Sequence, residues 1–168
     1  MKKSLLLFTS LFLTAGFFTA SAPAQTNPVP AAAEETLPAP PKPILDGFTA
    51  DPAIRIFGDS YYVYPTSDKT NWMTTDFSVW SSKNLIDWKK EGMVLDVAHD
   101  LKWANIKAWA PDCVERNGKF YFHFVAGDRI GVATAGKPTG PFVDALGHPL
   151  IERSEKVRTY PIDPVSAH

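Results

Sequence analysis

Three aspartates that border prolines are the residues of this sequence best suited to chemistry. Asp51 and Asp163 each precede a proline and Asp112 follows one, at intervals of 61 and 51 residues along the chain. In a fold that repeats with this spacing, the three carboxylates would gather around one pocket, as acid–base work on a sugar requires. A turn explains any one Asp-Pro pair equally well, and a symmetric fold can repeat a structural aspartate. The spacing therefore raises a catalytic hypothesis beside a structural one.

Five tryptophans within 38 residues favour a carbohydrate as the ligand of such a pocket. They are Trp72, Trp80, Trp88, Trp103 and Trp109. Sugar rings present C–H faces that stack on indole rings, so carboxylates beside tryptophans suit a saccharide. Trp80 and Trp88 lie in strand-like segments, and we expect them to pack in the core. Trp109 stands three residues before Asp112, and we expect it to form the wall of a sugar subsite.

The elements that must position these residues are short strands joined by tight turns. Residues 53–57 and 61–64 flank one glycine-containing turn, and residues 113–116 and 120–125 flank another. Aromatic and β-branched runs on both sides of such turns are typical of β-hairpins. Two further strand-like segments follow each hairpin. Four short strands in each repeated unit predict an all-β propeller, with a β-sandwich as the alternative.

Residues 94–108 join the two predicted units. Trp103, Ile106 and Trp109 would share one face of a helix there, but the segment runs into Ala110-Pro111 between two hairpins. We therefore expect an irregular loop, with a helix as the alternative.

The first 43 residues have the composition of an export signal and a tether. Lys2 and Lys3 precede an apolar run over 5–20, and small residues at 22 and 24 allow cleavage after Ala24. The run is short for a membrane span, which is the alternative. Six prolines in 25–43 predict an extended linker. We expect a signal peptide at 1–24, a linker at 25–43, a folded region at 44–168, and an exported product that is periplasmic or extracellular, with no membrane attachment after cleavage.

Other chemistries find little support in the sequence. The formal net charge of −1 shows no basic excess of the kind that nucleic-acid binding needs. No glycine-rich phosphate loop, nucleophile elbow or Cys-x-x-Cys pair is present. The single cysteine, Cys113, is expected to be a small buried side chain, and His123 a packed or cross-strand histidine rather than a ligand. We expect no cofactor and no bound metal.

A series of ordered motifs runs through nearly all of the predicted folded region. They are TADPAI at 49–54, YYVYPTS at 61–67, VWSS at 79–82, LIDW at 85–88, AWAPD at 108–112, IGVA at 130–133, PTGPF at 138–142 and PIDP at 161–164. Together they resemble glycoside hydrolase family 43. The resemblance implies a five-bladed β-propeller that hydrolyses arabinose- or xylose-containing plant polysaccharides with inversion, of the α-L-arabinofuranosidase or β-xylosidase type.

The same resemblance assigns roles to individual residues. Asp51 matches the general base, and Asp163 matches the acidic residue that tunes the pKa of the general acid and orients it. Trp109 lies in a segment that contributes to the sugar-binding wall, and Asp112 and Trp72 are further candidates for substrate binding. We expect a monomer whose partner is a carbohydrate such as arabinan or arabinoxylan.

One part of the family's pattern has no match in this chain. The family's general acid is a glutamate in the next blade, whereas this chain ends five residues after Asp163. None of the glutamates at 91, 115, 152 and 155 stands in the motif of the acid. Five units of this spacing need roughly 300 residues, so we expect about two blades and the start of a third. We predict that the 168-residue form is inactive; the alternatives are a non-catalytic carbohydrate-binding module or a non-functional fragment that does not fold.

Overall fold

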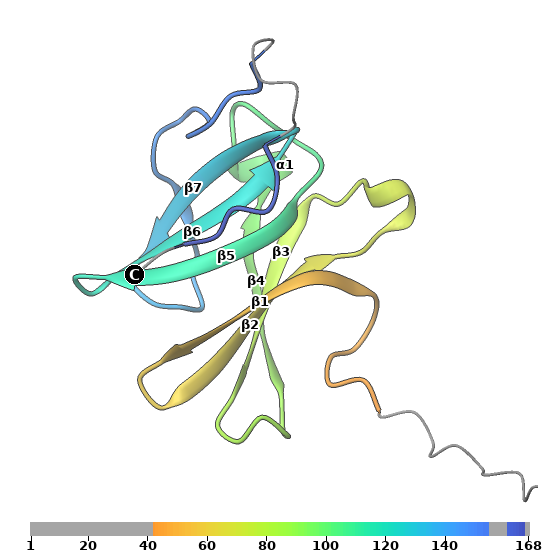
Figure 1. Cartoon of the computed structure of the whole chain (residues 1–168), viewed down its shortest axis with the longest axis vertical. Helices are drawn as coiled ribbons and strands as arrows, with labels where there is room; N and C mark the ends of the chain where they lie inside the picture. Colours follow the sequence, from red (N-terminus) through yellow and green to blue (C-terminus); the bar gives the residue numbers. More distant parts are fainter. Residues whose placement is uncertain (1–41, 155–160, 167–168) are drawn as a thin grey trace, which may run out of the picture. The chain divides into compact units, whose positions relative to one another are not determined.

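The described residues form two antiparallel β-sheets of four strands each (Figure 1). The structure is a computed structural model, and it describes residues 42–154 and 161–166. The signal peptide predicted at 1–24 and nearly all of the linker predicted at 25–43 lie outside these residues. In the described part, no helix is long and apolar enough to cross a membrane. The all-β prediction with four strands per unit is confirmed.

The first sheet follows the chain from strand to strand. Its members, in the order β1-β2-β3-β4, are β1 (Thr49–Phe57), β2 (Ser60–Ser67), β3 (Asp76–Ser82) and β4 (Lys89–Asp96). Gly58 begins the β1–β2 turn with φ of 62°, a conformation that glycine adopts without strain. A single 3₁₀ turn, Thr70–Trp72, lies between β2 and β3.

The second sheet repeats this layout. It contains β5 (Trp109–Arg116), β6 (Lys119–Ala126), β7 (Arg129–Ala135) and the short β8 (Val143–Asp144), again in chain order. Asn117 and Gly118 both have positive φ, as a two-residue type I′ hairpin turn requires. Meanders of four sequential strands argue against the Greek-key connections of a β-sandwich.

The segment between the sheets is mostly irregular, as expected. Residues 94–96 belong to β4, and a one-turn helix, α1 (Val97–Asp100), follows them. The Asp96 carboxylate caps this helix by accepting a hydrogen bond from the Ala98 N–H at 2.9 Å. The continuous helix considered for 94–108 is not formed.

Aromatic side chains from both sheets build one core. The Phe122 ring of β6 lies 5.7 Å from the Tyr64 ring of β2 and 5.2 Å from the Phe77 ring of β3. It also stacks on Phe142 at 4.8 Å. Because these rings share their contacts across the two sheets, neither sheet has a separate core.

The tryptophans predicted to pack in the core differ from each other. Trp80 is buried in β3, with the Lys90 ammonium 5.0 Å from its ring centroid, as expected for a packed side chain. Trp88 is half-buried just before β4, and its Nε1–H donates to the Leu85 carbonyl at 3.1 Å. The core prediction is therefore wrong for Trp88, because the residue belongs to the β3–β4 turn.

Replacing Phe122 with alanine tests the shared core. We expect Phe122→Ala to lower the free energy of unfolding by about 3–5 kcal/mol, because it removes a fully buried ring that contacts both sheets. The measurement is denaturant unfolding followed by tryptophan fluorescence and circular dichroism. Val143→Ala, at a side chain that is 66% exposed, is the control and should change stability by less than about 0.5 kcal/mol. Two separate transitions in the unaltered protein would contradict a common core.

Candidate functional site

Four of the predicted site residues line one cavity. Asp51, Asp163, Trp72 and Trp109 surround a space of about 350 Å³. The rest of the lining comprises Ala50, Thr66, Asp68, Thr74 and Ile162. The structure thus brings together residues from β1, the β2–β3 connection, β5 and the segment 161–166, which are far apart in the sequence.

The backbone places Asp51 at an irregularity of its strand. The β1–β2 ladder shifts register between Ala50 and Ala53, and Asp51 takes a left-handed φ of 44° within this bulge. A non-glycine residue in this region of φ/ψ space costs of order 1–3 kcal/mol and is frequent at functional sites. The strained residue leaves the Asp51 side chain exposed at the cavity.

The same bulge occurs in the second sheet, but with a different residue inside it. The β5–β6 ladder shifts between Trp109 and Asp112, and the residue with the left-handed conformation is Ala110, with φ of 42°. Asp163 takes the same conformation with φ of 53°. Asp51, Ala110 and Asp163 each precede a proline, so these three residues mark the true structural repeat.

The predicted repeat is therefore wrong at Asp112. The register shift lies between Ala50 and Ala53 in the first sheet and between Trp109 and Asp112 in the second, so Ala50 corresponds to Trp109 and Ala53 to Asp112. Asp112 is therefore two residues beyond the residue that corresponds to Asp51. Counting residues between aspartates missed this, because the bulge is defined by hydrogen bonds to the neighbouring strand. Asp112 does not line the cavity of Asp51 and Trp109 but a neighbouring one of about 390 Å³, which Asp51 and Asp163 also border.

Asp112 is enclosed by its own contacts. Its residue is 3% exposed, and its carboxylate accepts hydrogen bonds from the Arg55 guanidinium at 2.6 Å and from the Ser166 N–H at 2.6 Å. The Cys113 N–H donates to its other oxygen at 2.8 Å. Direct contact of Asp112 with a substrate stays a prediction; the structure shows the carboxylate bonded within the protein.

On the aromatic side of the cavity, hydrogen bonds join the β2–β3 connection to the start of β5 and the residue before it. The Trp109 Nε1–H donates to the Trp72 carbonyl at 2.8 Å. The Thr74 hydroxyl donates to the Ala108 carbonyl at 2.6 Å, and the Ala108 N–H donates back to the Thr74 carbonyl at 3.0 Å. Trp72 is 72% exposed, so one indole is open to solvent beside another that is half-buried. Both indoles line the cavity and offer apolar ring faces of the kind that can stack on a sugar.

Thr66 is a residue of the site that sequence reasoning did not single out. Its buried hydroxyl accepts a hydrogen bond from the Ala110 N–H at 2.8 Å, and so it satisfies the backbone of the second bulge. Thr66 also lines the cavity. The only signal in the sequence was its position in the YYVYPTS motif. That motif includes the threonine but does not indicate that it bonds Ala110.

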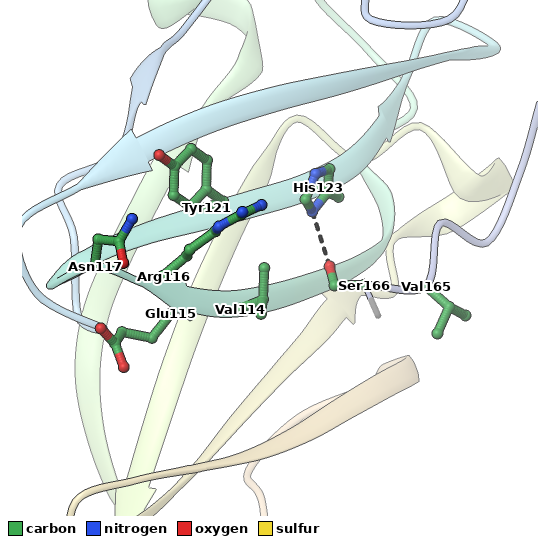
Figure 2. Close-up of a pocket in the computed structure, with 8 residues that line it drawn as sticks. All are labelled: Val114, Glu115, Arg116, Asn117, Tyr121, His123, Val165 and Ser166. Atoms are coloured by element: carbon green, nitrogen blue, oxygen red, sulfur yellow. Dashed lines mark hydrogen bonds between the residues drawn. The ribbon is translucent and has the colours of Figure 1, made fainter. Parts of the chain in front are cut away.

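A larger pocket lies along the β5–β6 hairpin and holds none of the predicted site residues (Figure 2). It has a volume of about 990 Å³, and its lining includes Glu115, Arg116, His123 and Ser166. His123 pairs with Asp112 across the strands, which confirms it as a packed, cross-strand histidine. Burial lowers the pKa of His123, and the negative charge of Asp112 opposes this effect. The net effect of the surroundings favours the neutral form of the ring.

The cavity around Asp51 combines carboxylates with aromatic side chains. Its carboxylates are those of Asp51, Asp68 and Asp163, and no glutamate lines it among the described residues. The same residues include no group of three histidine, cysteine or acidic side chains arranged to hold a metal ion. An exposed carboxylate facing an aromatic wall is suited to general-base chemistry on a saccharide.

Comparison with known proteins points to one family. The model of glycosyl hydrolases family 43 matches residues 40–168. The β-D-galactofuranosidase xynD of Aspergillus niger is 33% identical over 123 residues, which cover 65% of this chain and 36% of the relative. The xylosidase/arabinosidase 43A of Humicola insolens is 34% identical over 117 residues, or 59% of this chain and 36% of the relative.

Solved structures agree with these sequence matches. A family 43 β-xylosidase/α-arabinofuranosidase from a compost microbial metagenome, crystallised with xylotriose, superposes with a TM-score of 0.60 at 30% identity. The match covers 64% of this chain and 37% of that one. A family 43 enzyme from Xanthomonas citri complexed with xylose gives a TM-score of 0.57 at 35% identity, covering 61% of this chain and 34% of that one. The chain spans little more than a third of the length of these relatives.

The thiol of Cys113 offers a test of the packing beside Asp112. Cys113 is fully buried, as predicted, and burial raises the pKa of its thiol to about 12. We expect no reaction with a thiol reagent at pH 8 in the folded protein and full reaction in denaturant, because only the exposed thiolate is nucleophilic. Rapid labelling without denaturant would show that β5 is not packed as described.

Proposed function

Because the chain belongs to glycosyl hydrolases family 43, we propose that it supplies the base-bearing part of an inverting glycosidase for xylose- or arabinose-containing polysaccharides. The relatives named above are xylosidases, arabinosidases and a galactofuranosidase. The observation that carries the proposal is the convergence of Asp51, Asp163, Trp72 and Trp109 on one cavity. Plant cell-wall polysaccharides such as arabinoxylan are the substrate class that we infer, and export of the product remains a prediction consistent with a polymeric substrate.

In this proposal Asp51 is the general base. Its exposed carboxylate takes a proton from a water molecule as that water attacks the anomeric carbon on the face opposite the leaving group. Inversion requires the acid and the base to stand roughly 6.5–9.5 Å apart, so that the water fits behind the sugar. Asp163 enters the same cavity from a separate segment and would tune and orient the acid.

The aromatic wall would hold the sugar in place for this attack. Trp72 and Trp109 meet at a hydrogen bond of 2.8 Å, which fixes the position of the Trp109 indole. A pentose ring stacked there would present its hydroxyl groups toward the aspartates. Stacking by a rigid indole costs little conformational entropy, which makes the pair a suitable recognition surface.

A second candidate function is sugar binding without hydrolysis. The observation that favours it is the lining of the cavity, where the described carboxylates are all aspartates and none matches the family's glutamate acid. A stacking wall and one base are sufficient for recognition. They are not sufficient for the protonation of a leaving group.

Binding of xylotriose tests the site in either case. We expect calorimetry to detect binding to the purified chain, and Trp109→Ala to weaken it about tenfold because the stacking wall is lost. Trp109→Phe should keep part of the affinity. Trp88→Ala is the matched control, since Trp88 does not line the cavity. Equal affinity in Trp109→Ala and the unaltered chain would place the sugar elsewhere.

An activity assay tests the predicted inactivity of the 168-residue polypeptide. We expect the 168-residue polypeptide to give no turnover of aryl arabinofuranosides or aryl xylosides, because a general acid contributes roughly 10²–10⁴-fold and no glutamate matching the family's acid lines the cavity among the described residues. A chromogenic assay at pH 5 to 8 checks this. Turnover that Asp51→Asn abolishes would contradict the predicted inactivity and establish Asp51 as catalytic.

A further inference from the structure

We propose that Asp112 is a positioning residue, which acts with Arg55 and His123 to hold residues 163–166 so that Asp163 reaches the cavity of Asp51. The inference rests on the proposed function for its catalytic meaning. The contacts on which it depends, those of Asp112 and Ser166, lie outside the cavity of Asp51 and Trp109.

The Asp112 carboxylate connects three parts of the chain. Its Oδ2 atom accepts from the Arg55 Nη2 of β1 and from the Ser166 N–H, both at 2.6 Å. Its Oδ1 atom accepts from the Cys113 N–H within β5 at 2.8 Å. Hydrogen bonds to an ionised acceptor are stronger than neutral ones, and their strength grows where water is excluded. With 3% exposure, Asp112 meets this condition.

Arg55 relates this contact to the strand that carries the proposed base. It lies four residues after Asp51 on β1. Its Nε–H donates to the Cys113 carbonyl at 3.1 Å, and its Nη2 donates to the Asp112 carboxylate. The guanidinium therefore makes two hydrogen bonds to β5. A two-point contact of a planar guanidinium fixes orientation as well as distance. The position of β1 relative to β5 is therefore defined next to Asp51.

Ser166 is held from a second direction by His123. The hydroxyl of Ser166 lies 2.8 Å from the His123 Nδ1 atom, as the dashed line in Figure 2 shows. Because His123 is the cross-strand partner of Asp112, the backbone and the side chain of Ser166 are bound by neighbouring residues of one ladder. A serine held at both its N–H and its hydroxyl has a defined place along β5 and β6.

Ser166 is only three residues after Asp163, so fixing Ser166 also restrains the position of Asp163. Only Pro164 and Val165 intervene, and the proline ring limits φ at 164. Asp163 has a strained left-handed φ of 53°, and such a conformation persists where surrounding contacts over-determine it. The bonds at Ser166 are contacts of this kind, so Asp112 governs where Asp163 lies without touching the sugar cavity itself.

Amide exchange tests the structural part of the inference. In the full 168-residue chain, we expect Asp112→Asn to accelerate exchange of the Ser166 N–H at least about tenfold by NMR, because the neutral amide is a weaker acceptor. Exchange of the β6 and β7 core amides should change much less. Lys83→Met is the matched control, since it removes an exposed ion pair with Asp59 far from Ser166 in the chain.

A second variant covers the case in which Asp112→Asn does not fold. Ser166→Ala keeps the N–H and removes only the hydroxyl contact with His123. We expect it to accelerate exchange of the Ser166 N–H by a smaller factor, because that N–H still bonds Asp112 but the residue has lost its second contact. Unchanged exchange at residues 163–166 in Ser166→Ala, or in a folded Asp112→Asn, would overturn the inference.

A binding cycle distinguishes positioning from general stabilisation. We expect Asp112→Asn and Asp163→Ala each to weaken xylotriose binding, and the double variant to lose no more than Asp163→Ala alone, because both changes act through one group. Additive losses would overturn positioning through Asp163. Absence of xylotriose binding in the unaltered chain would count against the proposed function, whereas the exchange result would still decide the contact.

Discussion

Three residues that precede prolines hold a left-handed backbone conformation, and the site of this chain is organised around them. Asp51 and Ala110 lie within bulges at the start of β1 and β5, and Asp163 has the same conformation in the segment 161–166. A left-handed residue costs energy unless it is glycine, so each must be supported by its surroundings. Ala110 is supported by Thr66, and the bonds of Ser166 lie three residues beyond Asp163. At Asp51 and Asp163 the strained conformation coincides with a carboxylate that lines the cavity.

The shared aromatic core makes this arrangement rigid. Phe122 contacts rings from both sheets, and the Trp109 indole bonds the backbone of the β2–β3 connection. The two sheets therefore support the cavity as one unit, although each is a simple meander. Just after the two bulges, Arg55 of β1 and Asp112 of β5 add a hydrogen-bonded ion pair between the sheets. Asp112 is buried and Arg55 partly exposed in this ion pair, and such a pair is weak evidence for stability.

Membership of family 43 gives this geometry its chemical context. The chain covers 36% of each of the two curated relatives named above, and the activity of a whole protein therefore remains a proposal. Within the described residues, the cavity contains a candidate base, a second aspartate and a stacking wall. A base and a wall alone are consistent with recognition, and catalysis requires an acid in addition.

The sequence by itself was sufficient for the features that depend on neighbouring residues. Hairpins around Gly58 and around Asn117 and Gly118 follow from turn chemistry and from alternating aromatic strands, so they were predicted correctly. The motifs around Asp51, Asp163 and Trp109 also identified the family, because their order along the chain is specific. Only the tertiary structure decided the register of the bulges, which makes Ala110 rather than Asp112 the counterpart of Asp51. The hydrogen-bond partners of Asp112 were decided in the same way, since bonds between residues distant in sequence leave no trace in local spacing. Trp88 was predicted to lie in a strand, and only the structure places it in the β3–β4 turn.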